Sequence, residues 1–305
     1  MSQSNRYPTV RLRKAKSSPR RKGYPWYYSD EIAFDRRTRN IKSGEVIRIE
    51  DTDVGPMGLF SFNPKSKISA RLLDLNSDAQ IDQDWIKKQL HKALELREEL
   101  FDSAFFRLIH GEADGLPGVV IDRFGANAVF QPNSSWADCF KEQILDSLVS
   151  LGIQNIVLNG MSRARKLEGL DQTSEIVRGA IEKPIAVPMN GAVYFADILN
   201  GQKTGLFFDQ RVNHEFASKL SKNREILDVF SHVGGFGLAT LVAGAKSATL
   251  VDSSQNALEL AQKGAEKSGV GDRVTIIKSD AFDAMSELNK SGKKFDFVIC
   301  DPPAF

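Results

Sequence analysis

The spacing of apolar residues changes along the chain, and each pattern predicts a different kind of structure. Between 44 and 62, apolar and polar residues alternate between Gly and Pro turns, which predicts a small all-β segment. Residues 83–101 show the 3.6-residue period of an amphipathic helix. We expect its apolar face to contain Ile86, Leu90, Ala93, Leu94 and Leu100.

The rest of the chain mixes strands with helices. The sequence predicts strands at 119–121 and 153–158, a helix over 136–150, and two strands joined by Asn190-Gly191, which accept the positive φ of a type I′ turn. From 224 the pattern is β-α-β-α-β-α-β, with strands at 225–230, 248–251, 274–278 and 295–300. That alternation predicts a parallel sheet covered by helices, and so an α/β fold.

The 305 residues are enough for several domains. We expect a small β domain with a basic arm over 1–78, an α+β middle domain over 79–190, and part of a Rossmann-like domain over 191–305. No apolar run reaches the length of a transmembrane helix, so we expect no membrane partner. The two cysteines suggest no disulfide framework, and no signal peptide is apparent, which favours the cytoplasm.

Charge is distributed unevenly along the chain. Residues 1–42 contain twelve Lys/Arg and three Asp/Glu, a net of +9, so the remainder carries −7 of the overall +2. Basic residues beside aromatic ones, Trp26 among them, suit a polyanion such as RNA, because cations contact phosphate and rings stack on bases. For residues 1–20 a solvated arm is the stronger explanation, and an organellar transit peptide is a weaker one.

Acidic residues lie at the ends of three successive predicted strands. Ligands of open parallel sheets bind outside the carboxyl ends of the strands, so Asp228, Asp252 and Asp280 predict one site. The arrangement suits S-adenosylmethionine: Asp228 would meet its ammonium group, Asp252 its ribose hydroxyls and Asp280 its adenine amino group. Gly234 and Gly235 would let backbone N–H groups approach the same ligand.

A dinucleotide is the alternative ligand for these glycines. The register that starts at Gly235 places Thr240 where the motif G-x-G-x-x-G requires its third glycine, which argues against it. A tight strand-to-helix turn would explain the glycines but not three acidic strand ends. We expect further cofactor contacts from the neighbours of these residues: Phe230, Ser253 and Ala281.

The run Asp301-Pro302-Pro303-Ala304-Phe305 follows the fourth predicted strand. Two prolines remove two N–H donors, so nearby acceptors can face a planar base. Phe305 offers a ring on which that base can stack, which contributes about 1–3 kcal/mol. Pro302, Pro303 and Phe305 are therefore predicted to bind a nucleobase.

Several motifs together resemble the RlmI-like family of class I methyltransferases, which form 5-methylcytidine in large-subunit ribosomal RNA. The resemblance implies a cofactor, S-adenosylmethionine, and a Rossmann-like catalytic domain. It also implies an N-terminal PUA domain, an RNA-binding β-barrel, over 1–78. The motifs that carry it are Gly23–Trp26, Asn63–Ile68 with Arg71, Glu112–Gly118, Ile121–Gly125, Gly201–Arg211, Gly234–Phe236 and Asp301–Phe305.

The resemblance also implies roles for single residues. Asp301 would hydrogen-bond the cytosine edge, while Lys203, Arg211 and Trp26 would contact RNA. The family's catalytic Cys would lie beyond Phe305, so we expect the 305 residues to lack methyl-transfer activity. One departure from the family pattern is His232-Val233, which stands where the family has Tyr-Thr.

Other functions stay open. Methylation of a purine ring or exocyclic nitrogen suits Asp-Pro-Pro-aromatic and needs no covalent nucleophile, and the chain could also be an RNA-binding fragment without catalysis. The spacing His110-x-Glu112-x-Asp114 suggests a metal, but no Cys or second His accompanies it, so we expect none. Cys300, on an apolar strand, is expected to be buried. A homodimer is kept open, and a loop supplies further candidates for RNA contact: Arg163, Arg165 and Lys166.

Overall fold

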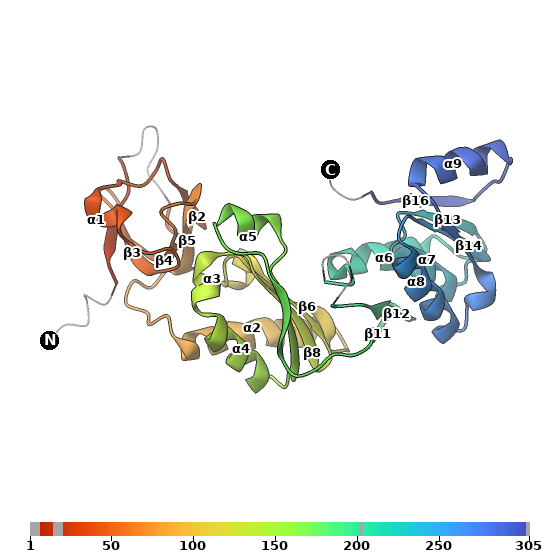
Figure 1. Cartoon of the computed structure of the whole chain (residues 1–305), viewed down its shortest axis with the longest axis horizontal. Coiled ribbons are helices and arrows are strands. Elements are labelled where there is room, and N and C mark those ends of the chain that lie inside the picture. The colour runs from red at the N-terminus through yellow and green to blue at the C-terminus, as the bar shows by residue number, and fades with distance from the viewer. Residues whose placement is uncertain (1–6, 15–20, 200, 202–203, 303–305) are drawn as a thin grey trace. The chain divides into compact units, whose positions relative to one another are not determined.

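The computed structural model describes residues 7–14, 21–199, 201 and 204–302. Contacts between residues divide the chain into two compact units, Met1–Ala180 (unit 1) and Ile181–Phe305 (unit 2). Figure 1 labels the elements of each unit. Three residues predicted to bind RNA lie outside the described residues: Lys203, Pro303 and Phe305.

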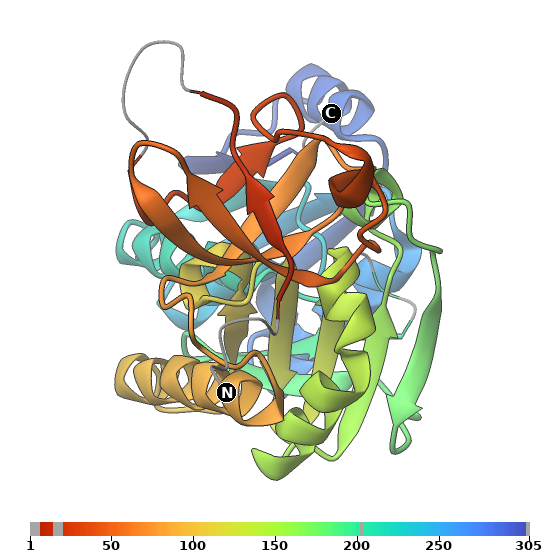
Figure 2. The ribbon, with the colours of Figure 1, turned by 90° about the vertical axis from the view of Figure 1, so that its left-hand side faces the viewer.

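Unit 1 begins with a five-stranded sheet that curves around an apolar core (Figure 2). The predicted all-β segment is confirmed, because β3 and β4 form an antiparallel pair within it. The fully buried Tyr27, Phe60 and Phe62 fill the core. In sheet order the strands are β1 (Thr9–Arg11), β3 (Val46–Asp51), β4 (Gly55–Phe62), β5 (Ile68–Asp74) and β2 (Trp26–Tyr28), and the helix of this part is α1 (Arg36–Arg39).

A second five-stranded sheet completes unit 1, and α2 and α4 lie side by side on it (Figures 1 and 2). In sheet order its strands are β10 (Ser174–Arg178), β9 (Asn155–Asn159), β8 (Asn127–Pro132), β7 (Val119–Phe124) and β6 (Phe105–His110). The helices are α2 (Gln83–Leu100), the 3₁₀ turn η2 (Gly111–Asp114), α3 (Ser135–Cys139), α4 (Lys141–Ser150) and α5 (Arg163–Leu167).

Two details of the predicted helices are wrong. The helix expected over 136–150 is two helices, α3 and α4, interrupted at Phe140, whose ring packs 6.0 Å from that of Trp136. The helix predicted over 83–101 is confirmed as α2, but Leu100, in its last turn, is 62% exposed and does not belong to the buried face. Within the part of the chain that the structure describes, no helix is long and apolar enough to cross a bilayer.

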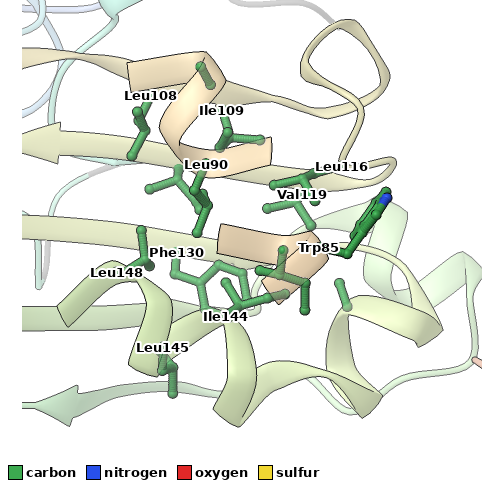
Figure 3. Close-up of a cluster of buried hydrophobic side chains, with 14 of the residues drawn as sticks. Trp85, Leu90, Leu108, Ile109, Leu116, Val119, Phe130, Ile144, Leu145 and Leu148 are labelled. Atoms are coloured by element: carbon green, nitrogen blue, oxygen red, sulfur yellow. The ribbon is translucent and has the colours of Figure 1, made fainter. Parts of the chain in front are cut away.

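The two sheets of unit 1 share one buried apolar cluster. Val46, Leu59 and Leu73 of the first sheet belong to the same cluster as Trp85 of α2 and Trp136 of α3. Figure 3 shows side chains from α2, α4 and the second sheet directed into this cluster. Burial of apolar surface stabilises a fold by about 25 cal/mol per Å², so the shared cluster ties the two sheets together.

Unit 2 consists of a β-hairpin and a parallel sheet in the order β15-β14-β13-β16. All three pairings in that sheet are parallel, which confirms the predicted α/β pattern. The strands are β11 (Ile185–Met189), β12 (Ala192–Ala196), β13 (Glu225–Val229), β14 (Ser247–Asp252), β15 (Val274–Lys278) and β16 (Phe297–Cys300). The helical segments are η3 (Phe208–Gln210), α6 (Arg211–Lys219), α7 (Gly235–Val242), α8 (Gln255–Lys267), η4 (Gly271–Arg273) and α9 (Ala281–Lys290).

The hairpin turn forms as predicted, with φ of 53° at Asn190 and 78° at Gly191. The hairpin packs on α8, since the N–H of Val193 donates to the hydroxyl of Ser268 at 2.8 Å. The boundary between units 1 and 2 therefore falls after Ala180, so that the hairpin belongs to unit 2. The sequence suggested a domain boundary after residue 190.

Candidate functional site

The loop between β13 and α7 has an unusual backbone. Phe230 and His232 have φ values of 65° and 50°, a region that costs a non-glycine residue roughly 1–2 kcal/mol, and Gly234 follows at 80°. Strain of this kind concentrates at functional sites, where the surrounding structure holds it. The loop therefore indicates a candidate functional site at the carboxyl end of β13.

The loop borders a cavity of about 260 Å³ at the carboxyl ends of three strands. Phe230 and Ser231 follow β13, Asp252 ends β14, and Asp301 follows β16. This is the edge at which ligands of open parallel sheets bind. The lining residues are Leu206, Phe207, Asp209, Gln210, His214, Phe230, Ser231, His232, Val233, Gly235, Phe236, Asp252, Ser253, Asp301 and Pro302.

Asp252 holds the strained loop against the end of β14. Its carboxylate accepts the N–H of His232 at 2.8 Å and the N–H of Ser254 at 2.9 Å. Asp252 is partly exposed and Ser253 is exposed, and both line the cavity. The carboxylate is therefore fixed in place without being enclosed, which suits a group that accepts hydrogen bonds from a ligand.

Asp228 lies beneath the loop and does not line the cavity. Its Oδ2 accepts the N–H of Gly237 at 2.8 Å, and its buried Oδ1 has no hydrogen-bond partner among the described residues. Burial raises the pKa of this carboxyl from 3.8 to about 7, and the charges of Asp252 and Asp301 add to the effect. The direct contact with a ligand that we expected for Asp228 stays a prediction.

Asp280 and Ala281 also lie outside the lining of the cavity. Asp280 is the N-cap of α9, where its Oδ1 accepts the N–H groups of Phe282 at 2.8 Å and Asp283 at 3.4 Å. Capping by itself explains an Asp at this position. Ala281 is buried at the start of the helix.

His214 is a lining residue that the sequence analysis did not single out. It is 3% exposed, its ring centroid lies 4.5 Å from that of Phe236, and none of the described residues forms a hydrogen bond with its Nδ1. Burial lowers the pKa of the imidazole from 6.5 to about 4, so His214 is neutral at pH 7. His214 lies one helical turn from Gln210, which also lines the cavity, but that spacing alone does not mark a site in the sequence.

Gly235 gives His214 the room that it occupies. A Cβ atom added to Gly235 would lie 2.7 Å from Nε2 of His214, closer than side chains approach one another. The hydroxyl of Tyr194 donates to the carbonyl of Gly235 at 3.2 Å from the other side. Gly235 thus allows a close approach between α6, α7 and the hairpin, while Gly234 supplies the left-handed turn.

Trp26 and Arg211, two predicted RNA-contacting residues, lie elsewhere. In unit 1 the indole N–H of Trp26 donates to Glu112 at 2.7 Å, and Arg71 pairs with the same carboxylate at 3.0 Å. Arg211 starts α6 in unit 2, where its carbonyl accepts a hydrogen bond from Asn190 at 2.8 Å, and it does not line the cavity.

Two further expectations are wrong. Arg165 is not a candidate for RNA contact, because it is buried and pairs with Asp138 at 2.7 Å. Cys300 is exposed rather than buried, because β16 pairs only with β13 in the described sheet. Among the described residues, no three His, Cys, Asp or Glu side chains gather as metal ligands would, and Asp114 is engaged by Arg97 at 2.7 Å.

Family comparisons match both ends of the chain. Residues 10–75 match a PUA-like domain, and residues 210–304 match the family described as conserved hypothetical protein 95. A putative S-adenosylmethionine-dependent methyltransferase from Streptococcus mutans shares the fold, with a TM-score of 0.79 and 18% identity over 97% of this chain and 77% of its own. SMU.776, a putative methyltransferase complexed with SAH, gives a TM-score of 0.77 and 19% identity over 92% of this chain and 72% of its own.

A curated relative is closer in sequence. Ribosomal RNA large subunit methyltransferase I of Aliivibrio fischeri is 35% identical over 97% of this chain and 76% of its own length. The same name belongs to a relative from Alteromonas mediterranea at 33% identity, over 97% of this chain and 75% of its own. With its PUA-like first sheet and the methyltransferase fold of unit 2, the chain belongs to the family of ribosomal RNA large subunit methyltransferase I.

Proposed function

We propose that this protein methylates large-subunit ribosomal RNA with S-adenosylmethionine as the methyl donor. The observation that carries the proposal is the cavity at the carboxyl ends of β13, β14 and β16, where Asp252 and Asp301 meet the strained loop. The family supplies the substrate class, because its named members act on ribosomal RNA.

The lining of the cavity fits that cofactor. Asp252 is the proposed acceptor for the ribose hydroxyls, with Phe230 and Ser253 beside it, and the loop through Gly234 and Gly235 faces the same space. When bound, S-adenosylmethionine supplies an electrophilic methyl group on a sulfonium centre. Asp280 and Ala281 remain proposed neighbours of the adenine because they follow β15 at the same edge of the sheet.

Asp228 has a revised role in this proposal. Its carboxylate accepts the N–H of Gly237 and is absent from the lining, so we assign it a role in supporting the loop. A carboxyl with a pKa of about 7 changes charge near neutral pH, so a cation in the cavity would favour its ionised form. The positive charge of the cofactor and the charge of Asp228 are therefore expected to be coupled.

For the substrate we propose cytosine at carbon 5, with Asp301 and Pro302 next to the base. That reaction requires a thiolate that adds to carbon 6, and neither described cysteine lines the cavity. We therefore propose that these 305 residues bind the cofactor but need a thiol from elsewhere to form 5-methylcytidine. Methylation of a purine nitrogen is the second candidate, because it needs no thiol.

Calorimetry with S-adenosylhomocysteine tests the cofactor assignment. Asp252→Asn should weaken binding by an order of magnitude or more, since hydrogen bonds to a charged group contribute about 1.5–3 kcal/mol. Asp272→Asn, at an exposed site outside the cavity, is the matched control and should bind as the original chain does. Tight binding of NADH, or unchanged affinity in Asp252→Asn, would contradict the assignment.

Methyl transfer is tested separately with labelled S-adenosylmethionine and ribosomal RNA. Digestion of the RNA to nucleosides then distinguishes 5-methylcytidine from a methylated purine. We expect no labelled 5-methylcytidine from the 305 residues alone. Its appearance would contradict the proposed need for a further thiol, whereas a labelled purine would establish the second candidate.

A further inference from the structure

Unit 1 carries four exposed cations where its two sheets meet. Lys65 and Lys67 lie in the turn between β4 and β5, and Arg163 and Lys166 lie on α5. We call these four residues the junction surface. None of them is engaged in an ion pair within the described part of the chain.

A buried carboxylate brings the two pairs together. Glu168, the residue that ends α5, is 6% exposed and accepts hydrogen bonds from Ser66 at 2.8 Å and from Asn63 at 2.9 Å. Arg71 of β5 pairs with the same side chain at 3.2 Å. Because Ser66 lies between Lys65 and Lys67, and Glu168 directly follows α5, these contacts hold the turn that carries the two lysines against the end of α5.

The junction is also tightly packed. A Cβ atom added to Gly44 would lie 2.5 Å from Sγ of Cys139 and 2.7 Å from the carbonyl oxygen of Ser135. Together with the shared apolar cluster, this contact packs the first sheet closely against α3 and the second sheet. The turn with Lys65 and Lys67 and the helix α5 therefore belong to one packed unit.

In both segments, a buried polar residue that holds the fold together has exposed cations next to it in the sequence. In the turn, Ser66 is buried whereas its two lysine neighbours are exposed. On α5, Arg165 is buried against Asp138 whereas Arg163 and Lys166 are exposed. Arg71 forms ion pairs with the nearby acids Glu112 and Glu168. Asp171 is the exposed acid of the loop that follows α5.

We propose that the junction surface binds the phosphate backbone of RNA, so that one RNA segment contacts the PUA-like sheet and α5 at once. The inference rests on the proposed function for its choice of polyanion. Cations that phosphate neutralises release counterions from RNA, which makes such binding strongly dependent on salt.

Paired charge removal tests the proposal on the full chain. The variants are Lys65→Ala/Lys67→Ala on the first sheet, Arg163→Ala/Lys166→Ala on α5, and all four together. Lys88→Ala/Lys92→Ala is the matched control, because both lysines are exposed on α2, which carries none of the four junction residues. The probe is a single-stranded fragment of large-subunit ribosomal RNA, with affinity measured at several salt concentrations.

Each pair should reduce the slope of log affinity against log salt by about 1.4, which is about 0.7 for each lost phosphate contact, and the four changes together by about twice that. The control should keep the original slope, and affinity for S-adenosylhomocysteine should be unchanged in every variant. Circular dichroism checks that the exposed substitutions leave the fold intact.

The outcomes separate this inference from the proposed function. If RNA binds but both junction pairs behave like the control, the junction surface is not its binding site. If only one pair alters the slope, the claim that RNA spans both sheets is wrong. If the original chain binds no RNA while it binds S-adenosylhomocysteine, the proposed RNA substrate fails, and this inference fails with it.

Discussion

At the residue scale, the contact between Gly235 and His214 predicts that Gly235→Ala has opposite effects on stability in the presence and in the absence of His214. Gly235→Ala should lower the free energy of unfolding by about 1–3 kcal/mol, because its Cβ would press on an imidazole enclosed between Tyr194 and Phe236. In a His214→Ala background the same change should stabilise instead, since Ala is favoured over Gly in a helix by roughly 1 kcal/mol. Urea unfolding of the four chains in the cycle measures both values. Equal costs in the two backgrounds would show that the two residues are not in contact.

His214 and Asp228 give opposite pH dependences. His214 has a pKa of about 4 when folded and 6.5 when unfolded, so its contribution to stability is full above pH 6.5 and is lost as the pH falls towards 4. Asp228 has a pKa of about 7 when folded and 3.8 when unfolded, so its protonated form favours folding at low pH and that contribution is lost as the pH rises from 4 to 7. Each effect is on the order of 3 kcal/mol, and the two nearly cancel between pH 4 and 6.5.

Single variants should expose each effect. Between pH 6.5 and 4, Asp228→Asn should lose stability as the pH falls, because only the histidine effect remains. His214→Gln should gain stability over the same range. Urea unfolding followed by circular dichroism gives the values, and slopes of the same sign in both variants would show that at least one pKa is not displaced as described.

The sequence predicted part of the lining and missed the rest for a physical reason. Asp252 and Asp301 could be found because the end of a parallel strand dictates where a side chain emerges. His214 could not be assigned in this way, because its role depends on α6 packing against α7, which no local pattern records. Asp228 was placed at the correct strand, but sequence alone does not show whether a carboxyl at a strand end lies under a loop or above it.

At the element scale, Gly44 is expected to control how α3 docks on the first sheet. Gly44→Ala should destabilise unit 1 by about 2–4 kcal/mol, because the positive φ of 91° and the clash with the carbonyl of Ser135 add together. Gly55→Ala is the matched control, with φ of 84° and open space where the Cβ would lie. Thermal unfolding followed by circular dichroism compares the two. Equal losses would mean that backbone strain alone, and not the contact with α3, accounts for the effect.

Elements with a strong period were predicted well, and irregular ones were not. The strands of unit 2 and the helix α2 have patterns that extend over several residues, so their place could be found within a few positions. The interruption between α3 and α4 comes from Phe140, whose ring packs on Trp136 in the core. That is a tertiary effect, and no breaking residue marks it in the sequence.

At the scale of the whole molecule, the shared cluster of unit 1 predicts that the PUA-like part cannot be removed cleanly. Deleting residues 1–75 takes away Val46, Leu59 and Leu73, which belong to the same buried cluster as Trp85. The remaining chain should bind a hydrophobic dye such as ANS and lose thermal stability, because apolar surface is uncovered. A shortened chain that melts at the original temperature without binding the dye would contradict this. Substitution of charges is therefore a cleaner way to locate RNA contacts than deletion.

The division of the chain illustrates what sequence patterns leave out. Three segments could be separated by their patterns of strands and helices, but contacts group the first two into unit 1. The reason lies in side chains such as Leu59 and Leu73, which face the second sheet rather than the interior of the first. A periodic pattern shows that a residue is buried without showing what covers it.

The three tryptophans, Trp26, Trp85 and Trp136, all belong to unit 1. Intrinsic fluorescence excited at the indole band therefore observes only that part of the protein. Trp26 lies 5.9 Å from the guanidinium of Arg71, the side chain that also engages Glu168 at the junction surface. RNA that binds there should change the emission spectrum directly, whereas the lining of the cavity in unit 2 contains no Trp. The protein thus carries a built-in optical probe for one of its two proposed ligands.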